Sequence, residues 1–230
     1  MPMCGRYYRK SDKQKIADAF HVAQADDFAL PPWDYNVAPS TNQPIIRNNR
    51  DTGERELVLL RWGLIPFFTK SLASFKTFST IDARAEGIET SRTFREPFKK
   101  RRCLVPASGF YEWKRIDPKN KQPFAFDLTN GNVMAFAGLW DAWKDPSDGK
   151  WLQSFSIVTT DANEIMAPVH NRMPVILHSG DFDRWLSREE THQLPIDLLR
   201  PFPTDEMEAF EVSKDVGNVR NNHAELLNSA

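Results

Sequence analysis

Residues 102–128 read RCLVPASGFYEWKRIDPKNKQPFAFDL, and this stretch decides the fold. Arg102–Trp113 and Pro123–Leu128 are rich in apolar and aromatic residues, as β-strands are. Between them, Ile116–Gln122 carries Asp, Pro and Asn, which are typical of a turn. The stretch therefore predicts two strands joined by a hairpin loop.

Strand-like runs also lie on both sides of this hairpin. They are Pro44–Arg47, Glu56–Leu64, Val133–Trp140 and Ser154–Thr160. Because no repeat and no long linker divides the chain, we expect one domain spanning residues 1–230. Strands predominate and helices fall irregularly between them. This pattern predicts an α+β fold, with a mixed, barrel-like β-sheet and peripheral short helices.

The first helix is expected over residues 12–24. Apolar residues recur there at helical spacing, and Ser11 followed by Gln14 reads as a capping box, with Ser11 as the N-cap. Shorter helices are expected at Ala162–Ala167, Asp181–Ser187 and Ile196–Leu199.

Composition bounds the function classes. The 230 residues are 40% hydrophobic and include only two cysteines, which argues against a disulfide framework and against a zinc site. No apolar run approaches the roughly 20 residues of a membrane span, and the N-terminus lacks a secretory signal. We therefore expect a cytoplasmic protein with no membrane partner and no zinc site.

Net charge gives no general attraction to nucleic acid. The formal charge is −1, so any DNA affinity must come from a local patch. The basic run Lys99–Arg102 is one candidate for tracking a DNA backbone, although such runs are commonly just solvated.

Cys4 offers a distinctive chemistry if it begins the mature chain. Its α-amine would have a pKa near 8 against about 10.4 for lysine, so roughly 400-fold more of it would be neutral and nucleophilic at neutral pH. That amine condenses with an aldehyde to an imine, which the adjacent thiol closes to a thiazolidine. Alternatively, Cys4 is a small apolar residue in a first strand. Cys103 lies in an apolar stretch, and we expect it to be structural.

Glu112 and His170 are candidates for proton transfer. Glu112 stands between large aromatics, and an apolar setting would raise its pKa toward neutrality. His170 precedes a proline-containing loop, and a neutral imidazole there could move protons near pH 7. The alternatives are an exposed acid on the polar face of a strand and a hydrogen-bonded structural histidine.

Asp82, Arg84 and Glu86 occupy alternate positions and would share one face of a strand. They form either a surface ion-pair ladder or a site where Arg84 holds a phosphate. Trp62, Phe67 and Phe68 are candidates for stacking on bases, although two of the three could equally be core.

Together these motifs resemble the SRAP family (SOS-response-associated peptidase), whose members form covalent crosslinks to abasic DNA. The motifs that carry the resemblance, in chain order, are Cys4–Arg6, Tyr35–Pro39, Arg61–Pro66, Asp82–Glu86, Gly109–Lys114, His170–Pro174 and Val216–Asn221.

The resemblance implies an abasic-site sensor that forms a thiazolidine through Cys4. His170 would assist opening of the sugar ring, Glu112 would move protons near the Cys4 amine, and Asp82 would join this catalytic group. DNA-binding roles are implied for Arg6, Asn36, Trp62, Phe67, Phe68, Arg84, Arg172 and Asn218. The partner would be single-stranded DNA containing abasic sites, bound by a monomer. The family is also linked to autoproteolytic exposure of the cysteine. The resemblance implies no metal and no organic cofactor.

Two departures from the family pattern matter. The family has Cys directly after the initiator Met, whereas this chain begins Met1-Pro2-Met3-Cys4, so translation from Met3 or removal of Met1–Met3 is required. Asp82 stands where the family usually has Asn, and an ionised Asp accepts hydrogen bonds but cannot donate them. We expect a shifted pH optimum.

Three rival functions remain at this level. An N-terminal-nucleophile amidohydrolase would also use a leading Cys-Gly. A non-enzymatic single-stranded DNA-binding module would use the aromatics and the basic run. A protease acting on other proteins would need Cys4 or Glu112.

Overall fold

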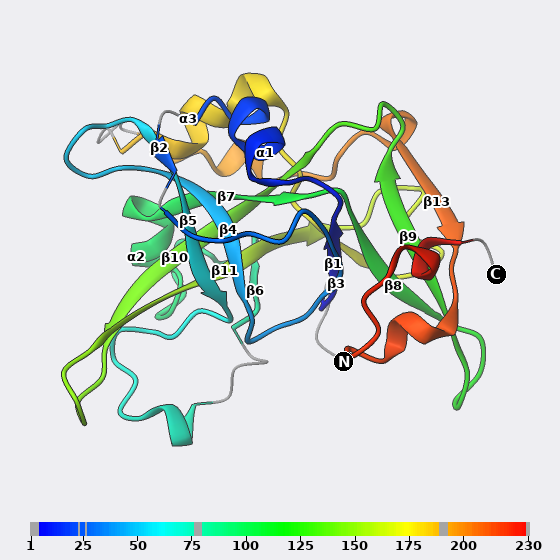
Figure 1. The fold of residues 1–230 in the computed structure, drawn as a ribbon, viewed down its shortest axis with the longest axis horizontal. Coiled ribbons are helices and arrows are strands. Elements are labelled where there is room, and N and C mark those ends of the chain that lie inside the picture. The colour runs from blue at the N-terminus through cyan, green and yellow to red at the C-terminus, as the bar shows by residue number, and fades with distance from the viewer. Residues whose placement is uncertain (1–4, 23, 26, 76–79, 189–192, 229–230) are drawn as a thin grey trace.

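Five strands close into a barrel in this computed structural model, which describes residues 5–22, 24–25, 27–75, 80–188 and 193–228 (Figure 1). The ring consists of β4 (Asn42–Asn48), β5 (Arg55–Trp62), β7 (Arg102–Ala107), β10 (Met134–Lys144) and β11 (Trp151–Asp161). Neighbours pair in the order β11-β10-β7-β4-β5. A parallel pairing of Phe155 with Trp62 then joins β5 back to β11 and completes the ring. The expected mixed, barrel-like sheet is confirmed.

Three short strands extend the barrel sheet. β6 (Asp82–Arg84) runs parallel to β11, β12 (Arg172–Pro174) runs antiparallel to it, and β2 (Gln24–Ala25) pairs with β5. Thr159 of β11 is paired with both Arg84 and Pro174. β11 therefore brings β6 and β12 to its two edges near the same point.

The second sheet has five antiparallel strands. Their order is β13 (Met207–Glu211), β9 (Lys121–Leu128), β8 (Gly109–Arg115), β1 (Tyr7–Arg9) and β3 (Asp34–Val37). The predicted hairpin is the β8–β9 pair, in which Phe110 lies opposite Phe126. The run Arg102–Trp113 is two strands rather than one, because the chain passes from the barrel to the second sheet at Ser108.

Aromatic side chains form the core between the two sheets. Tyr7 packs against Trp62 and Phe136, with ring centroids 5.2 and 5.9 Å apart, and Phe110 stacks on Phe126 at 5.1 Å. All five are buried. Burial of a large apolar side chain is worth roughly 1.5–3 kcal/mol, so this cluster fixes how the sheets meet.

Helices are short and peripheral. They are α1 (Lys13–Ala19), α2 (Arg95–Lys100) and α3 (Phe182–Leu186), with 3-10 turns η1 (Leu72–Ser74), η3 (Ser179–Asp181), η4 (Ile196–Leu198), η5 (Thr204–Glu206), η6 (Lys214–Gly217) and η7 (Ala224–Leu227). None of the helices in the described ranges is long and apolar enough to cross a membrane.

The structure corrects the first helix in two ways. Asp12, not Ser11, is the N-cap, since its carboxylate accepts from the Lys15 amide at 2.8 Å, while Gln14 bonds to Asp18. The helix ends at Ala19 rather than at residue 24, because the chain turns through a positive φ of 51° at His21.

The three shorter helix predictions have different outcomes. Residues 181–187 do contain α3, and 196–199 contain the 3-10 turn η4. The expected helix at 162–167 is instead a series of turns, in which the Asn163 carboxamide oxygen accepts from the Met166 amide at 3.1 Å. That side-chain bond would cap a helix, but Pro168 has no N–H to continue the bonding pattern, so the turn does not extend into a helix.

Candidate functional site

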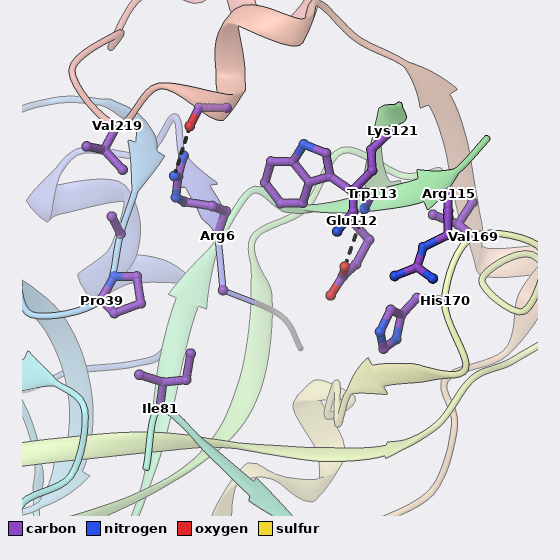
Figure 2. A pocket seen from close by; sticks show the side chains of 13 residues that line it. Arg6, Pro39, Ile81, Glu112, Trp113, Arg115, Lys121, Val169, His170 and Val219 are labelled. Carbon is purple, nitrogen blue, oxygen red and sulfur yellow. Dashed lines mark hydrogen bonds between the residues drawn. The ribbon is translucent and has the colours of Figure 1, made fainter. Parts of the chain in front are cut away.

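A cavity of about 730 Å³ opens where β1, β8 and the turn before β12 converge, and we call it the central cavity (Figure 2). Its lining residues are Gly5, Arg6, Ala38, Pro39, Ile81, Glu112, Trp113, Arg115, Lys121, Val169, His170, Gly217 and Val219. The topology therefore gathers the start of the chain, the β8–β9 hairpin and the C-terminal segment at one place. A volume of this size suits a nucleotide-sized ligand.

Glu112 reaches the cavity from β8. Its neighbour Tyr111 is buried against Tyr8, so strand alternation turns Glu112 the other way. Glu112 is only 6% exposed, and its carboxylate accepts from the Trp113 amide at 3.4 Å. It is therefore not the exposed acid of the polar strand face that the sequence also allowed.

His170 enters from the turn that precedes β12, and Figure 2 shows its ring in the same part of the cavity as the Glu112 carboxylate. Its Nδ1 accepts a hydrogen bond from the Arg172 amide at 3.2 Å. Because Nδ1 accepts, the neutral ring carries its proton on Nε2. His170 can thus donate a hydrogen bond from Nε2 into the cavity while Nδ1 keeps its bond to the Arg172 amide.

Asp82 lies next to the cavity-lining Ile81. Its Oδ1 is buried and makes no hydrogen bond to the part of the chain that the structure describes. Burial raises the pKa of Asp82 well above its ordinary value, and the nearby Glu112 carboxylate raises it further. Arg172 and Arg84 pull that pKa down, but burial prevails. Asp82 is thus favoured in its protonated form, which can donate a hydrogen bond.

The two arginines near Asp82 differ in what they contact. Arg172 donates to both carboxylate oxygens of Glu86, at 2.6 and 2.8 Å, and to Asp161 at 2.9 Å. Arg84 is exposed and, among the described residues, has no salt bridge. Glu86 therefore pairs with Arg172 rather than with Arg84, and the ion-pair ladder, one of the two alternatives that the sequence left open, does not form.

Arg6 and Asn36 hold the C-terminal segment against the cavity. Arg6 donates to the Asn36 side chain at 2.6 Å and to the Val216 carbonyl at 2.7 Å. The Asn36 amide donates to the carbonyls of Asn218 and Asn221 at 3.0 and 2.9 Å. The side-chain oxygen of Asn218 accepts from a backbone amide two residues later. These residues shape the cavity rim, and Arg6 also faces the cavity itself.

The three aromatic residues predicted to stack on bases differ in burial. Phe67 is 62% exposed and meets Phe68 edge to face at 5.4 Å, and the Arg92 guanidinium lies 4.3 Å over the Phe68 ring. Trp62 is fully buried, and its Nε1 donates to the Ile81 carbonyl at 3.1 Å. The prediction that Trp62 stacks on a base is therefore wrong, because its ring belongs to the core.

The two cysteines also differ. Cys4 lies outside the described residues, but Gly5, which follows it in the chain, lines the central cavity. Cys103 is buried on β7, and burial raises the pKa of its thiol. A buried, protonated thiol is a poor nucleophile, in line with the expected structural role.

Sequence comparison now decides the family. The family described as SOS response associated peptidase (SRAP) matches residues 3–219. The chain belongs to the SRAP family. Abasic site processing protein YoqW of Bacillus subtilis is 41% identical over 232 residues, covering 99% of this chain and 100% of that protein. Abasic site processing protein HMCES of Pongo abelii is 32% identical over 241 residues, covering 86% of this chain and 68% of that protein.

Solved structures agree with the SRAP assignment. The crystal structure of a protein from Bacteroides thetaiotaomicron superposes with a TM-score of 0.88 at 28% identity, over 99% of this chain and 100% of that one. A protein from Bordetella bronchiseptica gives a TM-score of 0.76 at 27% identity, over 91% and 100% of the two chains.

The SRAP cavity also contains residues that sequence reasoning missed. Arg115 and Lys121 face each other across the β8–β9 hairpin, and both line the cavity with Val219. In the sequence they read as ordinary charges beside a turn. Only the pairing of the hairpin shows that they add two cations to the cavity mouth.

Proposed function

We propose that this SRAP protein captures abasic sites in single-stranded DNA as a covalent thiazolidine on Cys4. The observation that best supports this proposal is that Gly5, adjacent to Cys4 in the chain, lines the same cavity as Glu112 and His170. Relatives that match over the full length of the chain are named abasic site processing proteins, which supports the same substrate.

The proposed reaction is a condensation in two steps. The open-chain aldehyde of the abasic sugar reacts with the Cys4 α-amine to form a C=N bond, and one water leaves. The Cys4 sulfur then adds to the imine carbon, and the thiol proton passes to nitrogen. The product is the sum of protein and DNA less one water, and no electrons are exchanged.

Glu112 and His170 supply the proton transfers in this scheme. The buried Glu112 carboxylate accepts a proton from the Cys4 ammonium, which frees the amine to attack. As the ring opens, the Nε2 proton of His170 passes to the ring oxygen and the anomeric hydroxyl returns its proton to the same nitrogen, so the imidazole ends neutral. Protonated Asp82 donates a hydrogen bond to the opened sugar, the role that a family Asn would fill.

The side chains proposed to contact the DNA strand are ones that remain exposed or half-buried at the protein surface. Arg84 is exposed, lies near Asp82 and has no salt bridge among the described residues, so it would bind a phosphate of the lesion strand. Phe67 and Phe68 would stack on the neighbouring bases, which requires that those bases be unpaired. This requirement is the structural reason for preferring single-stranded DNA.

The proposal needs Cys4 at the N-terminus. With Met1–Met3 attached, the Cys4 nitrogen is an amide and cannot form an imine. Translation from Met3 with removal of that methionine meets the need, as does cleavage of Met1–Met3 by the protein itself, which would be the peptidase activity in the family's description. Intact mass of the native protein distinguishes a Cys4 terminus from one that retains Pro2.

The decisive experiment mixes protein begun at Met3 with a single-stranded oligonucleotide carrying one abasic site. We expect a band on a denaturing gel that persists without borohydride and that Cys4→Ala abolishes. Cys103→Ala is the matched control, because it removes the buried thiol and should leave the band intact. Glu112→Gln should slow band formation about 10²–10⁴-fold, the usual worth of a proton-transfer group.

A negative result in this crosslinking experiment would separate the rival functions. If a chain with a free Cys4 terminus forms no band, the crosslinking proposal is wrong. Turnover of glutamine without DNA would then favour an amidohydrolase. Equal noncovalent binding of abasic DNA by wild type and Cys4→Ala would favour a binding module.

A further inference from the structure

A second cavity, of about 920 Å³, shares none of its described lining residues with the central cavity. It lies beside the C-terminal end of α2, where the ends of β4, β5, β10 and β11 meet. We call it the basic groove. Its lining residues are Arg47, Arg50, Glu56, Lys99, Lys100, Arg101, Trp140, Asp141, Ala142, Trp151, Gln153, Arg188 and Leu194.

The groove is positively charged, although the net charge of the whole chain is close to zero. Six of its lining residues are Lys or Arg and two are acidic, an excess of four positive charges against a total of −1 for the chain. Arg47 pairs with Glu56 at 2.6 Å, and Arg101 with Asp141 at 3.2 Å. Both acidic side chains that line the groove are therefore already paired.

The other four cations have no acid partner within the described ranges. They are Arg50, Lys99, Lys100 and Arg188. Arg188 lies near like charge, since Arg50 and Arg47 add to burial in lowering its pKa, while Glu56 acts in the opposite direction and does not outweigh them. Gathering like charges without a counter-ion is unfavourable, so the groove is suited to an anion that carries several charges.

Two tryptophans line the same groove. Trp151 is 66% exposed, an unusual setting for a large aromatic side chain. The Arg47 guanidinium stacks 4.2 Å over the Trp140 ring and also donates to Gln153 at 3.1 Å. Cations interleaved with aromatic faces are the pattern of a path for nucleic acid, in which phosphates meet the cations and bases meet the rings.

The loop that carries Phe67 and Phe68 contacts the strand that forms one wall of the groove. The Asp141 carboxylate, on the groove wall, lies near the backbone N–H of Phe67, which acts to lower the pKa of that carboxylate. Two residues along β10, the Trp143 indole donates to the Thr69 carbonyl at 2.7 Å. The loop that carries Phe67 and Phe68 is thus fastened to the strand that forms the groove.

We propose that the basic groove binds the phosphate backbone of the DNA strand that flanks the lesion, beyond the Phe67–Phe68 loop. The inference rests on the proposed function for the nature of the strand. It gives a role to Lys99, Lys100 and Arg101 of the basic run. Arg102 is excluded, since it is buried and donates to the Trp185 carbonyl at 2.5 Å.

The test compares two triple variants with the same net charge. The groove variant is Arg50→Gln, Lys99→Gln and Lys100→Gln. The control variant is Lys15→Gln, Lys119→Gln and Lys214→Gln, three exposed cations that line neither cavity. All six changed residues are exposed, so both variants should fold.

Binding of a long undamaged single strand is measured by fluorescence anisotropy over a range of salt. Each lost phosphate contact reduces the salt slope by about 0.7, so the groove variant should lose about 2 from that slope. Between roughly 50 and 200 mM salt, wild type should lose about 20-fold more affinity than the groove variant does. The control variant should match wild type. An unchanged slope in the groove variant overturns the inference, as does an equal loss in the control variant.

A second substrate separates the two proposals. A short abasic oligonucleotide with one nucleotide on each side of the lesion can fill the central cavity but cannot reach the groove. The groove variant should crosslink it at the wild-type rate. If wild type itself forms no crosslink, the proposed chemistry fails while the salt slope still reports on the groove. If only the groove variant loses the short crosslink, the groove acts on the lesion site and the inference is wrong.

Discussion

Asp127 gives a stability test that depends on pH. It lies on β9 opposite Gly109, and its Oδ1 is buried without a hydrogen bond among the described residues. Burial, and then the nearby Glu208, raises its pKa to about 7. Lys10 lies 3.5 Å away and acts in the opposite direction, but its side chain is 45% exposed, so water weakens that effect.

The direction of the pH effect follows from the linkage between proton binding and folding. An acid whose pKa is higher in the folded chain than in the unfolded chain favours folding only while it is protonated. The free energy of unfolding therefore falls as pH rises from about 4 to about 7, and then stays level. Between pH 5 and 8 the penalty grows by about two pKa units, or about 2–3 kcal/mol before the Lys10 attraction is allowed for.

Asp127→Asn removes this penalty with little change in shape. We expect the variant to gain about 2 kcal/mol more over wild type at pH 8 than at pH 5, or roughly 4–8 °C in Tm for a chain of this size. Thermal unfolding at the two pH values measures it, with exposed Asp51→Asn as the control. A Tm difference from wild type that is the same at pH 5 and pH 8 would refute the reasoning.

Three further outcomes are expected. Gly138→Ala should cost about 1–3 kcal/mol by denaturant unfolding, because its Cβ would lie 2.8 Å from the Cys103 sulfur, and adding Cys103→Ala should recover part of the loss; a strictly additive double variant would contradict this. Trp62→Ala should cost about 3–5 kcal/mol, while Phe67→Ala should leave stability within about 0.5 kcal/mol and weaken single-strand binding by about 1–3 kcal/mol, so equal stability losses would argue against the separation of the two rings. Asp82→Asn, measured as crosslinking rate against pH, should extend activity to higher pH, because the Asn still donates where the protonated Asp would ionise, and an unchanged profile would remove Asp82 from the proposed chemistry.

The long strands could be predicted because their signals are local. Phe110 and Phe126 lie in apolar runs on either side of a turn, and they pair across the hairpin as expected. The short strands could not be predicted in this way. β6 has three residues and is defined by its pairing with β11, where Asp82 meets Ile157, far away in sequence. Such pairing depends on the closed barrel and leaves no periodicity to read.

The site was predictable in its chemistry but not in its geometry. Glu112 and His170 are of types that carry protons, and they do line one cavity. The base-stacking prediction for Trp62 was wrong because an aromatic residue before a glycine gives the same sequence pattern in a core as on a surface. Arg172 and Asn36 show a different limit, since only the fold reveals that the terminal guanidinium nitrogens of Arg172 donate to Glu86 and that the Asn36 amide donates to backbone carbonyls.

The contacts of Arg6 and Asn36 with the C-terminal segment bear on when the protein becomes active during synthesis. Gly217 and Val219 are part of the cavity wall, and they are held there by residues near the start of the chain. On the ribosome, the first residues emerge long before this wall is made. A nascent chain therefore lacks a finished pocket beside its first residues, and under the proposed function capture of a lesion waits for the completed polypeptide.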